Sequence, residues 1–244
     1  MQSNYLMGAP ASLESLGLDA HPAVSWEDAP EFLGLRHIRV DPALLTGADD
    51  PVLCRLEEYL DSVLPSQWLP APYGLPGLVD LRTLLSADFA ALGEHLAAEE
   101  GRDSGWEQDP SRSVPHLVEE CRRSYGLGAD AAALYLMVLA LPDPTDRNVR
   151  QWTAWKNARF KAAHTELAAS GRVGRADRAR AGRTLFLPGA WQETKAPRLP
   201  VERAKFQLLP HAKEHRSTAH TAVVPMMPVP VLFERAWAAQ TQKA

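Results

Sequence analysis

Few cysteines and no long apolar runs limit what this 244-residue sequence can be. Cys54 and Cys121 are its only cysteines and form no CxxC pair, which excludes a disulfide framework and a cysteine-rich zinc site. No run of about 18 apolar residues occurs, so no membrane-spanning helix is predicted. The first residues lack the basic region and apolar core of a secretory signal. We therefore expect a soluble, cytoplasmic protein.

Catalytic signatures are also scarce. No G-x-S-x-G, Walker A or kinase-type motif occurs. Residues 126–131 fit G-x-G-x-x-A, but the segment before them favours a helix, whereas a dinucleotide site needs a strand there, so we interpret them as a helix-to-helix turn. We predict no catalytic residue and no cofactor, and we expect that the protein is not an enzyme.

One histidine-rich segment fits a zinc pattern. His211 and His215 flank Glu214 as in H-x-x-E-H, the inverted zincin motif, and His220 could add a third ligand. The segment is polar and has prolines on both sides, whereas a catalytic zinc needs a rigid and dry site. We assign no metal site, and whether these histidines bind a metal stays open at this point.

Three other conspicuous side chains are interpreted as structural. Cys121 stands beside two arginines, but no base of fixed geometry is identifiable, so a buried and inert thiol is expected. Trp152 and Trp155 are expected to anchor a short helix in the core rather than to stack on bases.

The net charge of −4 conceals a strong asymmetry. Residues 1–110 hold 19 acidic and 5 basic side chains, whereas residues 145–183 hold 10 basic and 3 acidic ones. Such asymmetry suggests separate surfaces, one of which could contact a polyanion. The alternative is that the acidic part covers the basic part of the same molecule.

The first 110 residues are predicted to be mostly helical. Residues 1–30 are rich in small residues and proline and predict a loop or loosely packed arm, whereas residues 35–40 alternate like a half-buried strand. Helical spacing then predicts a helix from Pro51 to about Leu64, capped by Asp49 or Asp50. A second helix, which could be interrupted, is predicted from about Leu78 to before Gly101. The role of this acidic region is unknown.

The pattern becomes sharper in the next region. Residues 101–114 resemble a linker, where a domain boundary is placed, and Pro115–Ser124 is a predicted helix that Gly126 ends. The almost wholly apolar segment Asp130–Leu141 predicts a buried helix. Thr145 is a good N-cap for a short helix from Asp146 to about Trp155.

A third helix and a hairpin follow. Asn157 is the predicted cap of a helix that ends at Gly171 and buries one face, formed by Phe160, Ala163, His164 and Leu167. Residues 172–178 and 183–187 are predicted strands joined by a glycine-containing turn. Residues 191–244 are expected to form a proline-rich tail that closes with an amphipathic helix, Val231–Gln240.

The order helix, short helix, turn, helix and hairpin over residues 129–187 resembles the winged helix-turn-helix family. The resemblance covers about a quarter of the chain and rests on element order. It implies a winged-helix-like α+β domain over residues 111–190, in which Asn157–Ser170 enters the DNA major groove and the hairpin is the wing. The implied nucleic-acid contacts are Arg150, Lys156, Arg159, Lys161, Arg172, Arg175, Arg178, Arg180 and Arg183.

Physical chemistry agrees with this assignment. Basic side chains that neutralise phosphates release counterions, and the arginine fork can bond phosphate oxygens or guanine edges in pairs. The sequence departs from many winged helices because Pro142–Thr145 leaves little room for a strand between the first two helices.

We therefore predict a mainly α-helical, DNA-binding protein. Winged-helix modules also bind proteins, so the alternative is a non-enzymatic adaptor or subunit that uses its basic hairpin or its acidic N-terminal region.

Overall fold

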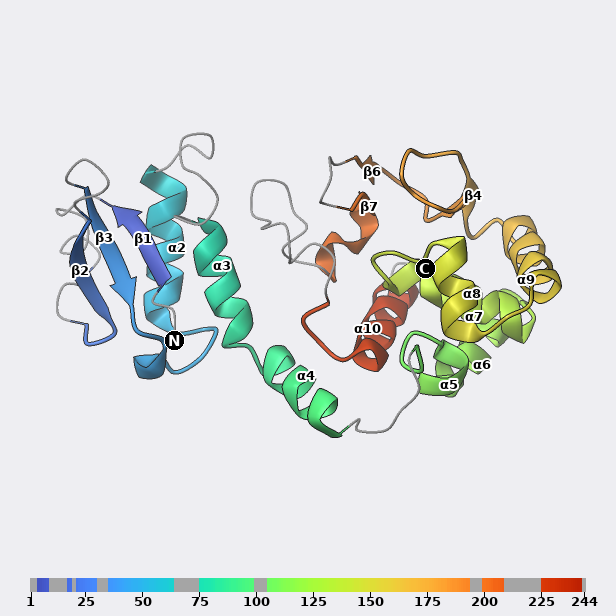
Figure 1. Ribbon diagram of the computed structural model, residues 1–244, viewed down its shortest axis with the longest axis horizontal. Coiled ribbons are helices and arrows are strands. Elements are labelled where there is room, and N and C mark those ends of the chain that lie inside the picture. The colour runs from blue at the N-terminus through green and yellow to red at the C-terminus, as the bar shows by residue number, and fades with distance from the viewer. Residues whose placement is uncertain are drawn as a thin grey trace. The chain divides into compact units, whose positions relative to one another are not determined.

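The computed structural model describes residues 4–8, 17–18, 21–29, 35–63, 75–98, 105–193, 199–208 and 225–242 (Figure 1). The described residues divide into two compact units, one up to Gly93 and one from Glu94 on. The described part of the protein is mainly helical, as predicted. None of its helices is both long and apolar enough to cross a membrane.

Unit 1 combines a small antiparallel sheet with two helices. Its strands are β1 (Asn4–Gly8), β2 (Val24–Ala29) and β3 (Leu35–Val40), in the order β1-β3-β2. β3 has the predicted bounds, but the expectation of a loop over residues 1–30 is wrong at β1 and β2. Both strands obtain their hydrogen bonds from β3, so long-range pairing forms them despite weak local signals.

The helices of unit 1 begin and break where the sequence indicates. A 3-10 turn, η2 (Pro42–Leu44), precedes α2 (Pro51–Val63), where Asp50 Oδ1 accepts from Val52 N at 2.9 Å and so caps the helix. α3 (Leu75–Leu84) belongs to unit 1, and α4 (Ala87–Ala98) runs across the boundary between the units after Gly93; together they confirm the interrupted second helix. Leu53, Leu56 and Ile38 are fully buried in the core of this unit.

Unit 2 is built around one central helix. α7 (Ala129–Ala140) is buried along residues 131–140, as expected for a helix that is apolar on every side. Packed against it are α6 (Pro115–Tyr125), α9 (Asn157–Ala169), α10 (Val229–Thr241) and the single turn α5 (Pro110–Ser113) (Figure 1). Gly126, at φ 67°, ends α6, and Gly128 precedes α7, which confirms the helix-to-helix turn.

The segment expected to be a separate tail belongs to this core. In α10, Leu232, Phe233 and Trp237 are buried in the same cluster as α7, and the Trp237 Nε1 donates to Glu120 Oε1 at 2.8 Å. The chain before α10 also forms β6 (Trp191–Gln192), which pairs with β7 (Val201–Glu202), and the 3-10 turn η3 (Arg203–Gln207). Strands of two residues are too short to show a period in the sequence, so these elements were not predicted.

Candidate nucleic-acid interface

α8 (Asp146–Thr153) and the start of α9 provide the helix–turn–helix. Thr145 Oγ1 accepts from Asn148 N at 3.1 Å, which confirms the predicted N-cap of α8. Ala154 has a left-handed φ of 54° and reverses the chain after α8. The prediction that Asn157 caps α9 is wrong: Asn157 is its first residue, and Lys156 holds the extended cap position without a side-chain hydrogen bond.

α9 presents opposite faces to the core and to solvent. Phe160, Ala163 and Leu167 are buried, as the sequence predicted. The fourth predicted member, His164, is half-buried, and its Nε2 lies 3.0 Å from Thr184 Oγ1 in the hairpin. The outward face carries one cation, and its members are Ala158, Lys161, Ala162, Thr165 and Ala169.

A hairpin follows α9, with a much shorter ladder than expected. β4 (Gly174–Arg175) pairs antiparallel with β5 (Leu185–Phe186), and residues 176–184 form the connecting loop. The carbonyl oxygen of Gly182 in that loop accepts a hydrogen bond from Asp146 N at 3.0 Å, which ties the loop to α8. A Cβ at Gly182 would lie 2.8 Å from Thr145 Cγ2, and its φ is 62°, so this approach requires glycine.

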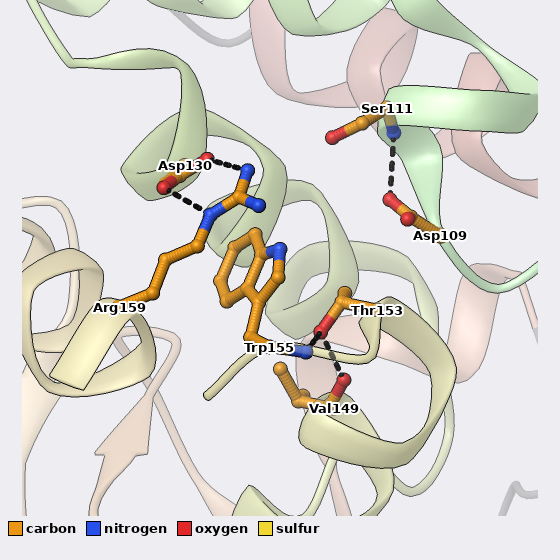
Figure 2. A network of polar contacts seen from close by, with 7 residues as sticks. All are labelled: Asp109, Ser111, Asp130, Val149, Thr153, Trp155 and Arg159. Carbon is orange, nitrogen blue, oxygen red and sulfur yellow. Dashed lines mark hydrogen bonds and ion pairs between the residues drawn. The ribbon is translucent and has the colours of Figure 1, made fainter. Parts of the chain in front are cut away.

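Arg159, expected on the groove-facing side of the third helix, is held by its own domain (Figure 2). Its Nε and Nη2 donate to the two carboxylate oxygens of Asp130, each at 2.7 Å, and its Cζ lies 5.0 Å from the centre of the Trp155 ring. The bonded carboxylate raises the pKa of Arg159 above its usual value. A base contact by this side chain would therefore require the pair with Asp130 to break.

Further hydrogen bonds hold Trp155 and the neighbouring segments in place (Figure 2). Trp155 is buried, as predicted, and its backbone N donates to Thr153 Oγ1 at 3.3 Å. The Thr153 hydroxyl in turn donates to Val149 O at 2.7 Å. Asp109, which sequence reasoning did not single out, caps α5 by accepting from Ser111 N at 3.0 Å, and burial raises the pKa of its carboxyl.

Arg183 is not a surface contact, which corrects the expectation from the sequence. Its side chain is 2% exposed and its Nη2 lies 2.8 Å from Glu202 Oε2. Lys205 Nζ approaches the same oxygen at 2.7 Å and donates to Leu141 O at 2.6 Å. Burial lowers the pKa of both cations, that of Lys205 to about 8. A guanidinium shielded in this way cannot reach a phosphate in solution.

Two further predicted contacts stack on aromatic rings. The Arg178 Cζ lies 4.3 Å from the centre of the Phe186 ring and 5.2 Å from that of Trp191, so its side chain folds over the hairpin and β6. The Arg172 Cζ lies 3.9 Å from the Tyr125 ring centre, although Arg172 itself is exposed. Stacking holds these planes against the protein and limits how far they reach.

The five remaining predicted contacts are exposed. They are distributed over successive elements: Arg150 in α8, Lys156 in the turn, Lys161 in α9, Arg175 in β4 and Arg180 in the hairpin loop. Of these, Arg150 also lies over a ring, with its Cζ 6.0 Å from the Phe160 ring centre, and its Nε donates to Asp146 O at 3.1 Å. Arg147, which was not predicted, is also exposed in α8.

α9 and the hairpin lie close together at His164. Burial is the main cause that lowers the pKa of His164, the Asp146 carboxylate opposes this shift, and the Arg175 charge lowers the pKa further. Arg175 of the hairpin is therefore close enough to α9 for its charge to act on His164.

The chemistry of the remaining candidates is limited. Cys121 is fully buried, and burial raises the pKa of its thiol to about 12, which agrees with the expected inert thiol. Within the described residues no group of three or more histidine, cysteine, aspartate and glutamate side chains could hold a metal ion. His211, His215 and His220 lie outside the described residues.

No protein-family model, curated protein or solved structure matches this chain. The candidate interface therefore rests on its own geometry.

Proposed function

We propose that unit 2 binds duplex DNA through the exposed face of α9 together with the exposed cations of α8 and of the hairpin. The observation that carries this proposal is the placement of Arg150, Lys156, Lys161 and Arg175, all exposed, on consecutive elements of a helix–turn–helix–hairpin segment. Residues 145–183 hold seven more basic than acidic side chains, so this segment attracts a polyanion. The proposed role is binding, not catalysis.

The proposed contacts are mainly to phosphates. Lysine and arginine side chains at a duplex release counterions, which gives affinity without sequence information. Arg159, the side chain best suited to read a guanine edge, is occupied by Asp130. The outward face of α9 offers mainly alanines and Thr165, which favour apolar contact with thymine methyl groups. We therefore propose weak sequence preference.

The test is to measure the binding of the full chain to a random-sequence duplex by fluorescence anisotropy, at 50 and at 200 mM salt. We expect affinity that falls steeply with salt, and a Lys161→Ala/Arg175→Ala variant with a slope lower by up to about 0.9 per lost contact. The matched control is Arg122→Ala/Arg123→Ala, which removes the same charge from α6, where both arginines pair with Glu119.

Two results would contradict the proposal. One is no measurable binding by the folded chain at 50 mM salt, and the other is equal weakening in the Lys161/Arg175 variant and in the α6 control. Selection from randomised duplexes adds a further check: if Arg159 stays bound to Asp130, Arg159→Ala leaves the sequence preference unchanged.

The alternative proposal is a protein-interaction adaptor. It is favoured by the internal engagement of Arg159, Arg178 and Arg183, which leaves a smaller cationic surface than the sequence suggested. A folded chain that fails to bind DNA but binds an acidic protein partner through Lys161 and Arg175 would support it.

A further inference from the structure

Two buried hydrogen-bond donors beside the hairpin have no partner. The Arg178 Nη1 and the Trp191 Nε1 are shielded from solvent, and neither has a hydrogen-bond acceptor in the part of the chain that the structure describes. An unpaired buried donor is costly, and in a native protein it often marks the place of a water molecule or an ion. The two orphan donors therefore require a common explanation.

Both donors belong to one cluster of side chains. The Phe186 and Trp191 rings meet edge to face, with centres 5.2 Å apart. The Arg178 Cζ lies 4.3 and 5.2 Å from these two ring centres, and the Arg183 Cζ lies 5.0 and 5.6 Å from them. Two guanidinium groups thus contact the same pair of rings, where β5 of the hairpin meets β6.

Arg178 is the cation of this group that no carboxylate of the described residues pairs with. Arg183 and Lys205 share one carboxylate, that of Glu202, and the Asp143 carboxylate acts on both cations from farther away. Arg178 adds a third cation, close enough to lower the pKa of Arg183. The Asp146 carboxylate also acts on Arg183, so three carboxylates act on the three cations, but none of them forms an ion pair with the Arg178 guanidinium.

We propose that the Arg178 Nη1 and the Trp191 Nε1 bind a small free oxyanion of the phosphate or sulfate type. Guanidinium and indole N–H groups only donate, so they complement the accepting oxygens of such an ion, and the bond from arginine is charge-assisted. A water molecule could accept from both donors but would leave the Arg178 guanidinium without an anionic partner.

The site is distinct from the proposed DNA contact and does not rest on it. Both donor atoms are shielded, so a phosphate within a duplex backbone does not reach them. A small ion needs less room, and because Arg178 and Trp191 are each only half-buried as residues, movement of these two side chains would admit it.

The experiment is calorimetric titration of the full chain with inorganic phosphate, with sodium chloride of equal ionic strength as the reference. We expect saturable binding of one phosphate and a melting temperature that rises with phosphate but not with chloride. Trp191→Phe keeps the ring and removes the donor, so it should weaken phosphate binding about tenfold or more. Arg123→Ala, which removes an exposed cation of α6 outside both proposed sites, is the control and should bind phosphate as the parent does.

A second variant, Arg178→Lys, guards against a folding defect in Trp191→Phe. It keeps the positive charge, loses Nη1 and should also weaken phosphate binding about tenfold or more. The proposal is overturned if phosphate binds no better than chloride, which would assign the site to a water molecule, or if both donor variants bind phosphate as tightly as the parent. Equal weakening by Arg123→Ala would also overturn it, because the anion would then bind to the general surface charge. Loss of DNA binding in Trp191→Phe would contradict a free anion.

Discussion

Replacing Glu202 with alanine is the sharpest test of how unit 2 is stabilised. The Glu202 carboxylate is 2% exposed and accepts from Arg183 at 2.8 Å, from Lys205 at 2.7 Å and from the Leu187 backbone N at 3.1 Å. Glu202→Ala removes all three interactions and leaves two buried cations without their counterion. Breaking a buried ion pair by removing one partner costs about 3–5 kcal/mol of unfolding free energy.

Lys205→Met is the matched comparison. Lys205 is fully buried, and burial lowers its pKa to about 8, which shows that its charge is poorly accommodated in the folded protein. After this substitution Glu202 still pairs with Arg183, and the main loss is the bond to Leu141 O. We therefore expect Lys205→Met to cost about 1 kcal/mol or less.

The assay is urea unfolding of the full chain, read by amide hydrogen exchange along α7, because this helix reports on unit 2 alone. The reasoning would be refuted if the two variants lost equal stability, or if Glu202→Ala lost less than about 1 kcal/mol.

Three further outcomes are expected. Leu167→Ala should cost about 2–5 kcal/mol in the same assay, because Leu167 is fully buried between α9 and α7; a loss below about 1 kcal/mol would show that this contact is not formed. The folded pKa of Lys205 lies below the unfolded value of about 10.4, so the unfolded chain holds more protons than the folded one between these values. The unfolding free energy should therefore rise from about pH 8 to 9, and Lys205→Met should abolish this rise. An unchanged slope of the unfolding free energy against pH in that variant would contradict the argument. Above about pH 9 the raised pKa of Cys121 acts in the opposite sense, so the measurement ends there. In the native protein at pH 8 a thiol reagent should modify half-buried Cys54 much faster than Cys121, and equal rates would mean that Cys121 is accessible.

Local patterns were sufficient to place most helices of unit 2. The apolar run of α7, the Thr145 cap of α8 and the glycine that ends α6 each act within a few residues. Helix caps and helical periodicity depend on neighbours at most one or two turns away, so the sequence carries this information in a readable form.

Strands depended on more distant residues. β3 alternates clearly and was predicted, whereas β1 exists because residues 4–8 pair with residues 36–40. β6 and β7 have two residues each, so no periodicity could reveal them.

The candidate site shows the same division most clearly. The sequence by itself determined that basic side chains gather in residues 145–183 and that a helix–turn–helix with a following hairpin carries them. Only the tertiary structure decided which of them already have a partner: exposed Arg159 meets Asp130 from 29 residues earlier, and buried Arg183 meets Glu202 from 19 residues later. The sequence shows which side chains are charged, but their partners come from chain segments that only folding brings together. A cation that pairs with a carboxylate of the same protein has hydrogen-bond donors that are already occupied.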